Sequence, residues 1–235
     1  MKALLLAAGK GSRLGAAAAG LPKPLVSIGG STLLERNLQW VAAQQPEEIW
    51  INVHERAEQV MERVGSSMDG IAIRYSHEPS LLGTAGAWKK LEAVWDSTSL
   101  IVYSDNFMRF DLNALWTAHG AAGAALTAAL FDADRHRNTG IGGGRAEVRG
   151  DRIARFVEGG TTGLINAGVY CVEPGLAAEL PSGFLDFGHD VLPVLAAAGR
   201  LAGHVVEDSG YCLGVDTPGR LAMAREMVDT LEISP

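Results

Sequence analysis

The sequence of 235 residues is poor in cysteine and has no long apolar run, and each shortage excludes a class of protein. Cys171 and Cys212 are too few for a disulfide framework or a closed zinc site, so we expect reduced thiols in a cytoplasmic protein. No apolar run approaches the roughly 18–20 residues that cross a bilayer. The apolar N-terminal stretch continues into glycines and cations, which predicts a buried strand rather than a signal peptide.

Carboxylates are absent from the first 34 residues, although the whole chain carries a net charge of −7. This opening segment contains Lys2, Lys10, Arg13 and Lys23, and the first acidic residue is Glu35. The other 201 residues hold 16 cations and 27 anions. An acidic surface argues against general nucleic-acid binding. An acidic protein whose opening segment lacks anions is expected to bind an anionic ligand there.

Hydrophobic periodicity predicts an α/β fold with a doubly wound, mostly parallel sheet and one domain over residues 1–235. In the first half, strands alternate with amphipathic helices through short connections. The strands are expected at residues 1–7, 49–53, 71–75 and 99–103, and the helices from Thr32, around residues 57–64 and from the end of the loop EPSLLGTAG to about Val94. Thr32 and Glu35 have capping-box spacing, and Gly65 is placed to end the second helix.

The second half of the sequence has a different pattern. The glycine-rich stretch TGIGGGRAEVRGDRIARFVEGG is typical of β-hairpin material. A last helix is expected to begin at Pro218, since proline is favoured in the first helical position. The other elements expected here are helices at 112–119 and 191–197 and strands at 124–130, 164–172 and 201–206.

A glycine-rich loop follows the first strand, which is the usual place for a phosphate in an α/β sheet. The dinucleotide fingerprint fails because Leu14 stands where its third glycine is needed, and the Walker A pattern fails at Gly11. What remains is Gly9-x-Gly11-x-Arg13, followed by Lys23 between two prolines. Glycines let the backbone approach phosphates, and the two cations suit a nucleoside triphosphate.

These residues resemble the sugar-1-phosphate nucleotidyltransferases, also called nucleoside-diphosphate-sugar pyrophosphorylases, of the single-domain type. LLLAAGKGSRLG and LPKPLVSIGG resemble the signature loop of that family, and the resemblance runs over nearly the whole chain. It implies a Rossmann-like nucleotidyltransferase fold with a small sugar-binding part that contains a β-hairpin. The later matching segments are STLLERNLQWV, EPSLLGTAGA, VYSDN, RFVEGG, INAGVYCV, DFGHDVLP and GVDTPGRL.

The resemblance implies a reaction in which an NTP and a sugar 1-phosphate give an NDP-sugar and pyrophosphate. By similarity, Arg13 grips the β- and γ-phosphates, Lys23 neutralises the α-phosphate, and Asp105 binds Mg²⁺ as the cofactor. Asp216 is the second candidate metal ligand, although Gly214 stands where the family often has the first acid of this segment. A turn or helix cap is the alternative role for both carboxylates.

The resemblance also implies which residues contact the substrates. The expected nucleotide-binding residues are Ala7, Ala8, Gly9, Gly11, Ser12, Gly83 and Thr84, and the expected sugar-binding residues are Glu158, Asn166 and Gly168. The family often has Lys-Pro after that glutamate, where this chain has Gly159 and Gly160. The missing cation could be supplied by Arg135, Arg137 or Arg155. The segments GTAG and DFGHDVLP favour GTP with a mannose- or heptose-type sugar over UTP.

Three other functions stay open from the sequence. One is another enzyme of the same fold, such as a cytidylyltransferase for a non-sugar phosphate or a molybdopterin guanylyltransferase. A second is a catalytically inactive nucleotide-binding regulatory subunit, which Gly214 and Gly159 keep in consideration. A third is a Rossmann dehydrogenase, which Leu14 disfavours. The sequence fixes neither the sugar nor the oligomeric state.

Overall fold

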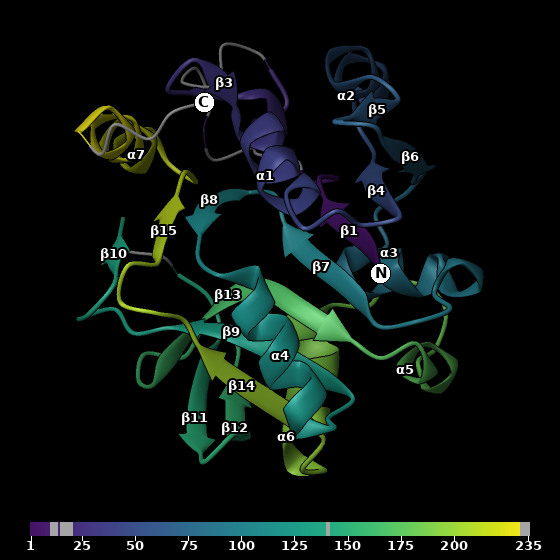
Figure 1. Ribbon diagram of the computed structural model, residues 1–235, viewed down its shortest axis with the longest axis vertical. Helices are drawn as coiled ribbons and strands as arrows, with labels where there is room; N and C mark the ends of the chain where they lie inside the picture. Colours follow the sequence, from purple (N-terminus) through teal and green to yellow (C-terminus); the bar gives the residue numbers. More distant parts are fainter. Residues whose placement is uncertain (10–13, 15–20, 140–141, 231–235) are drawn as a thin grey trace.

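The computed structural model describes residues 1–9, 14, 21–139 and 142–230 (Figure 1). Ten of the described strands form one sheet in the order β11-β12-β14-β9-β13-β7-β1-β4-β6-β5. They are β1 (Lys2–Leu6), β4 (Glu48–Val53), β5 (Ser67–Met68), β6 (Ile71–His77), β7 (Ser99–Tyr103), β9 (Leu126–Phe131), β11 (Arg145–Arg149), β12 (Arg152–Val157), β13 (Leu164–Val172) and β14 (Leu201–Val205). Two small sheets contain β2 (Ser27–Ile28) with β3 (Ser31–Thr32), and β10 (Arg137–Asn138), β15 (Tyr211–Gly214) and β8 (Asn106–Arg109).

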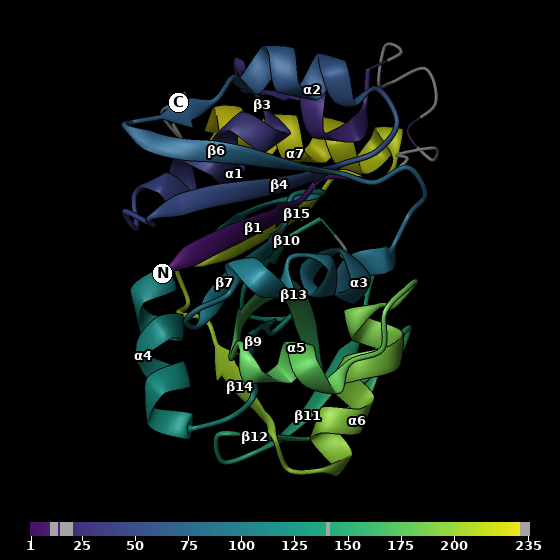
Figure 2. The ribbon, with the colours of Figure 1, turned by 90° about the vertical axis from the view of Figure 1, so that its right-hand side faces the viewer.

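Helices cover both faces of the large sheet, as a doubly wound fold requires (Figure 2). They are α1 (Leu33–Ala42), α2 (Ala57–Val64), α3 (Gly83–Lys90), α4 (Leu112–Ala122), α5 (Gly175–Glu179), α6 (Leu192–Ala197) and α7 (Pro218–Thr230). Short helical turns are η2 (Lys23–Leu25), η3 (Glu92–Val94) and the single π turn η4 (Phe187–Val191). Among the residues described, no helix combines the length and apolar character that a bilayer crossing needs.

The predicted α/β fold is confirmed, and its sheet is parallel from β7 to β6 and mixed elsewhere. β7, β1, β4 and β6 are parallel neighbours, as the alternation of strands and helices predicts. β13 then lies between β7 and β9 and runs antiparallel to both. Because of this reversal, the first residues of β13 lie at the carboxyl end of β7. The antiparallel strand therefore brings a late segment of the chain to the edge where the early loops are.

The alternating side chains of β1 divide the hydrophobic core into two layers. Ala3 and Leu5 pack on the face covered by α1, α2 and α4. Leu4 and Leu6 pack on the opposite face against α3, α5 and α6. All four side chains are at most 8% exposed, so β1 is buried on both faces. A continuous apolar run is typical of such a strand.

The predicted helix signals match the structure at several ends. Thr32 and Glu35 form both hydrogen bonds of a capping box at the start of α1. Gly65 ends α2 with φ of +78°, and α7 begins at Pro218. The third helix ends earlier than predicted, at Lys90, and the chain continues through the separate turn η3.

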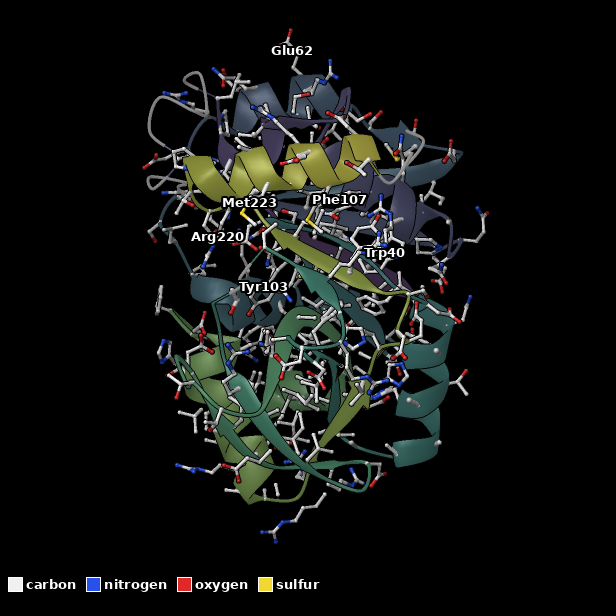
Figure 3. The ribbon with its side chains drawn as sticks, turned by 90° about the vertical axis from the view of Figure 1, so that its left-hand side faces the viewer. Trp40, Glu62, Tyr103, Phe107, Arg220 and Met223 are labelled. Carbon is white, nitrogen blue, oxygen red and sulfur yellow. The ribbon has the colours of Figure 1, made fainter. Side chains whose placement is uncertain are left out.

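A third, smaller hydrophobic cluster lies under α7 and joins segments that are far apart in the sequence. Figure 3 shows Phe107 beneath α7. Its buried members come from the first loop, α1, β2, β8, β15 and α7, and are Leu14, Val26, Ile28, Leu33, Phe107, Leu213, Val215, Leu221, Ala224 and Val228. The three candidate functional segments that carry Lys23, Asp105 and Asp216 each lie next to a member of this cluster along the chain. It therefore holds them together without contributing to chemistry itself.

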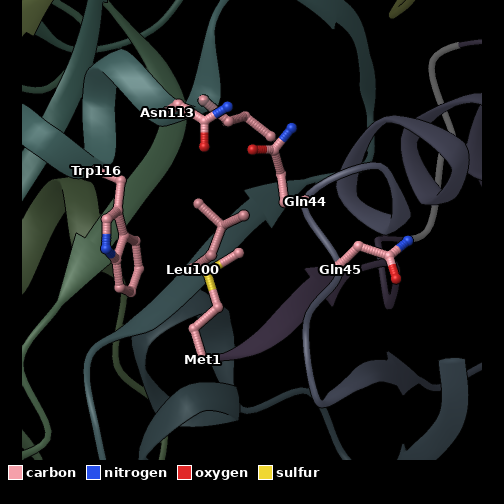
Figure 4. Close-up of a pocket in the computed structure, with 7 residues that line it drawn as sticks. Met1, Gln44, Gln45, Leu100, Asn113 and Trp116 are labelled. Atoms are coloured by element: carbon pink, nitrogen blue, oxygen red, sulfur yellow. The ribbon is translucent and has the colours of Figure 1, made fainter.

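A small cavity of about 240 Å³ lies at the amino end of the central strands, away from those segments (Figure 4). Met1 and Leu100, at the starts of β1 and β7, form its base. Trp116 and Asn113 of α4 line one side, and glutamines from the end of the α1 segment line the other.

One of the most deeply buried side chains is a cation, Arg36 of α1, which is only 1% exposed. Its Nε donates to the Ile28 carbonyl at 2.7 Å and its Nη2 to the Gly29 carbonyl at 2.5 Å. The guanidinium carbon lies 5.3 Å from the centre of the Phe107 ring. Burial lowers the pKa of Arg36. Arg36 therefore fastens the β2–β3 hairpin to α1 through two charge-assisted hydrogen bonds.

We expect Arg36→Met to lower the free energy of unfolding by about 2–3 kcal/mol, because the buried Ile28 carbonyl and the neighbouring Gly29 carbonyl both lose their donor. Chemical denaturation monitored by circular dichroism measures this loss. Arg74→Met is the matched control, since the side chain of Arg74 is 61% exposed, and it should change stability by less than about 0.5 kcal/mol. Equal effects of the two substitutions would contradict the anchoring role.

Candidate functional site

Four parallel strands end at the same edge of the sheet, where loops from separate parts of the sequence meet. Ala7–Gly9 follows β1, Glu78–Leu82 follows β6, and Ser104 and Asp105 follow β7. The Ser104 hydroxyl donates to the Leu6 carbonyl at 2.6 Å and ties the ends of β7 and β1 together. The carboxyl edge of parallel strands is the usual place for ligands in such sheets.

The Lys23 ammonium lies between two carboxylates at this edge. Its Nζ is 3.2 Å from Oδ2 of Asp105 and 2.5 Å from Oδ1 of Asp216. Lys23 is 6% exposed and sits in η2, Asp105 follows β7, and Asp216 lies between β15 and α7. Three residues that the sequence singled out from distant segments are thus in direct contact.

Asp216 lies just before α7 and contacts two cations. The first turn of α7 is capped by Thr217, whose Oγ1 accepts from the Arg220 backbone N–H at 3.4 Å. The carboxylate of Asp216 faces Lys23 and also lies 3.5 Å from Nη1 of Arg220. Arg220 was not predicted, although its position four residues after Asp216 at a helix start is a signal for such a pair.

The two carboxylates fit a hard divalent cation. Oδ1 of Asp105 is buried and has no hydrogen-bond partner among the described residues, so one acceptor is left for a further ligand. The Asp216 carboxylate lies against the same Lys23 ammonium as Asp105 does, so the two carboxylates can bind one cation together. No three side chains of His, Cys, Asp or Glu gather into a metal site in the described ranges. This set suits Mg²⁺, which is commonly held by one or two carboxylates, water and substrate phosphates.

Both cysteines are buried thiols without a disulfide in the structure. Cys212, on β15, lies close to the carboxylate pair. Burial raises the pKa of its thiol well above the usual value, and Asp105 and Asp216 add to this effect. Burial also raises the pKa of the Cys171 thiol to about 12. Both groups are therefore protonated at neutral pH and are poor nucleophiles or metal ligands.

The predicted phosphate loop is described only in its first part. Ala7, Ala8 and Gly9 leave the end of β1, and the Ala7 N–H donates to Oδ1 of Asn52 at 2.7 Å. Gly11, Ser12 and Arg13, together with Lys10, lie outside the described residues. Their expected contacts with phosphate stay predictions.

Gly83 and Thr84 begin α3 and are locked against the loop that precedes η4. Gly83 has φ of +73°, and a Cβ there would lie 2.4 Å from the Leu185 carbonyl oxygen, so only glycine fits. The Thr84 hydroxyl donates to Oδ2 of Asp186 at 2.8 Å and accepts from the Phe187 N–H at 2.9 Å. In this structure the side chain of Thr84 holds the protein's own loop, and its expected contact with the base stays a prediction.

Glu158 follows β12 and points into a space bounded by glycines. A Cβ at Gly188 would lie 2.2 Å from Glu158 Oε2, and one at Gly144 would lie 2.8 Å from it. Burial raises the pKa of Glu158, and the charge of Asp186 raises it further. Two carboxylates therefore lie near each other on this side of the site, which is suited to accepting hydrogen bonds from hydroxyl groups.

Asn166 and Gly168 lie in an irregular part of β13. The pairing with β9 shifts register between Asn166 and Tyr170, which is where a β-bulge re-aims side chains. Asn166 donates to the Tyr170 hydroxyl at 2.7 Å and accepts from the Gly168 N–H at 3.1 Å. Gly168 has φ of +73° and packs on the ring of Tyr103, the last residue of β7. The bulge thus places these residues beside the segment that carries Asp105.

The departure from Lys-Pro after Glu158 has a local cause. Gly159 has φ of +69°, and the Gly160 N–H donates to the Val157 carbonyl at 3.2 Å, a bond that proline cannot make. Of the alternative cations, Arg135 pairs with Asp208 and Arg155 with Glu147. Arg145, which was not predicted, donates from Nε to the Gly160 carbonyl at 3.3 Å. The structure thus places a cation at this turn.

Known proteins show similarity over most of this sequence. A UTP–glucose-1-phosphate uridylyltransferase from Synechocystis is 29% identical over 85% of this chain and 56% of its own length. A mannose-1-phosphate guanyltransferase from Candida albicans is 29% identical over 93% of this chain and 62% of its own length. A D-glycero-α-D-manno-heptose 1-phosphate guanylyltransferase from Aneurinibacillus thermoaerophilus is 30% identical over 72% of this chain and 74% of its own length. The chain thus spans less than two thirds of the first two relatives.

Solved structures share the fold. HddC from Yersinia pseudotuberculosis, complexed with GMP-PN, superposes with a TM-score of 0.78 and 22% identity over 96% of this chain and 98% of its own. A candidate glucose-1-phosphate thymidylyltransferase from Bacillus anthracis, in complex with sucrose, gives a TM-score of 0.84 at 18% identity. The match covers 100% of this chain and 98% of that protein. The family model for nucleotidyl transferases matches residues 2–212. With a match over most of its length, this chain belongs to the nucleotidyl transferase family.

Proposed function

We propose that this protein transfers the nucleotidyl group of an NTP to a sugar 1-phosphate and releases pyrophosphate. The observation that carries the proposal is the convergence of Lys23, Asp105 and Asp216 at the carboxyl edge of the sheet. An oxygen of the sugar phosphate attacks the α-phosphorus, the new P–O bond forms, and pyrophosphate leaves with the electrons of the broken bond. Such a reaction needs alignment and neutralisation of charge rather than a covalent intermediate.

In this proposal, Lys23 supplies positive charge where the α-phosphate and the attacking phosphate meet. Lys23 is buried and begins η2, with Pro22 before it and Pro24 after it in the chain, so the ammonium has a fixed position before substrate binds. The nearby Arg220 offers a second cation at the same edge. Arg13 would grip the β- and γ-phosphates, as the family resemblance implies.

Asp105 and Asp216 would hold Mg²⁺. The bound ion would neutralise phosphate charge and bring the oxygens of the triphosphate to a fixed position. The free Oδ1 of Asp105 and the closeness of the two carboxylates support this assignment.

We further propose GTP and a mannose- or heptose-type sugar 1-phosphate as the substrates. Two of the relatives named above are guanylyltransferases for mannose 1-phosphate and for a heptose 1-phosphate. The uridylyltransferase from Synechocystis is the competing precedent for the base. The Glu158 carboxylate and the backbone carbonyl of Gly168 would accept hydrogen bonds from sugar hydroxyls.

A grid of NTPs against sugar 1-phosphates, with Mg²⁺ and a coupled assay for pyrophosphate, tests this proposal. We expect the highest kcat/KM for GTP with mannose 1-phosphate or a heptose 1-phosphate. Higher kcat/KM with UTP or another nucleotide would overturn the choice of base. Tight NTP binding without turnover in any combination would instead identify a regulatory subunit.

Lys23→Met and Asp105→Asn should each lower kcat by about 10²-fold or more. The first removes a positive charge aimed at the reacting phosphates, and the second removes an anionic ligand of the Mg²⁺ that would neutralise them. Steady-state kinetics with the best substrate pair measures this. Lys90→Met and Asp151→Asn are exposed controls of the same chemistry and should leave kcat within about twofold. Near-normal turnover in a site variant would remove that residue from the mechanism.

Asp216→Asn distinguishes a metal ligand from an ion-pair partner of Lys23. If Asp216 binds the cation, the Mg²⁺ concentration for half-maximal rate should rise by about tenfold or more, since an anionic ligand is lost. A Mg²⁺ titration at saturating substrates gives this value. An unchanged Mg²⁺ requirement would restrict Asp216 to holding Lys23.

A further inference from the structure

A buried pair outside the charged cluster connects the ends of three neighbouring strands. Asn52 lies on β4, between β1 and β6, and is 3% exposed, and Glu78 follows β6 and is 1% exposed. Asn52 Nδ2 donates to Glu78 Oε1 at 2.8 Å. Burying a carboxylate and an amide is unfavourable unless their hydrogen bonds are made. Their position therefore calls for an explanation.

The pair reaches a different loop at each of its ends. Oδ1 of Asn52 accepts from the Ala7 N–H at 2.7 Å, in the loop that begins the phosphate-binding signature. Oε2 of Glu78 accepts from the Leu82 N–H at 3.0 Å, one residue before Gly83 and the start of α3. The three hydrogen bonds form one chain, from the first loop to the loop before α3.

The direction of each hydrogen bond in this chain is fixed. The backbone N–H groups of Ala7 and Leu82 donate at its two ends, so the Asn52 and Glu78 atoms that face them must accept. Glu78 accepts with both oxygens, as an ionised carboxyl group does, and only the amide of Asn52 can accept from Ala7 while donating to Glu78. His54 also contacts the Glu78 carbonyl through Nδ1 at 2.7 Å, which holds the backbone of Glu78 in place.

We propose that Asn52 and Glu78 are positioning residues that set the spacing between the phosphate loop and the loop before α3, and thereby the affinity for the NTP. This inference rests on the proposed function, since it assigns the two loops to one nucleotide. Neither residue touches the reacting atoms. The pair acts on binding because two loops held in place before binding lose less entropy when the ligand arrives.

Polarity offers a sharp test of this proposal. Asn52→Asp alone places two carboxylates against each other, and Glu78→Gln alone turns an N–H group of the amide toward another donor. In the double variant, the carboxylate at position 52 accepts from Ala7 and from the amide at position 78, whose oxygen still accepts from Leu82. All three hydrogen bonds are then restored with nearly the same atoms.

We expect each single variant to raise KM for the NTP by about tenfold, with kcat within about threefold, because the charged cluster is untouched. The KM for the sugar 1-phosphate should stay within about twofold. Hydrogen exchange measured by mass spectrometry should be faster in peptides covering residues 5–9 and 78–84. The double variant should recover both properties. Asn113→Asp and Glu62→Gln, both exposed and remote, are the controls and should match the wild type; Asn113 is labelled in Figure 4 and Glu62 in Figure 3.

The possible failures are distinguishable. The positioning role is wrong if the wild type is active and the single variants bind the NTP as tightly as it does. It is also wrong if the double variant is no better than the single variants. Unchanged hydrogen exchange in both peptides would also overturn it. A wild type that neither turns over nor binds any NTP refutes the proposed function itself, and with it the nucleotide role of the pair.

Discussion

The structure depends most on keeping one lysine ammonium buried between two carboxylates. Burying Lys23 would cost several kcal/mol if it were unpaired, so its place is tolerable only while Asp105 and Asp216 stay beside it. Each of the three comes from a different part of the chain. The small hydrophobic cluster under α7 makes this possible, since its buried side chains adjoin all three segments. Breaking that cluster would separate Lys23 from both carboxylates and leave its ammonium without them.

The topology of the sheet brings the two sides of the candidate site together. The parallel strands place the first loop, the loop before α3 and Asp105 at one edge, and antiparallel β13 adds its own first residues there. Gly168 is essential to this arrangement because a Cβ would lie 2.7 Å from the Tyr103 ring. The same reasoning applies at Gly83, where the Leu185 carbonyl fills the space. At both positions, glycine allows a close approach between two segments that border the site.

Much of this could be predicted from the sequence, where signals are local. Buried strands, the capping box at Thr32 and the start of α7 follow from short patterns, and the bounds of β7 and β13 agree with the predicted ranges. The pairing of β8 with β15 could not be predicted, because their partners lie about a hundred residues apart and register leaves no local pattern. Asn52 was missed for a related reason. A single amide in an apolar strand gains meaning only when its partner, Glu78, is known.

The charges around Lys23 explain why the acidic chain keeps acids out of its first 34 residues. Lys23 and Arg220 balance Asp105 and Asp216, so the formal charges of this group cancel. A triphosphate approaching a neutral group gains little, and any further carboxylate in the first loop would repel it. Under the proposed function, a divalent cation on the two carboxylates would turn the group positive. Binding of the cation and binding of the nucleotide would then favour each other, and this reciprocity is a property of the charges themselves.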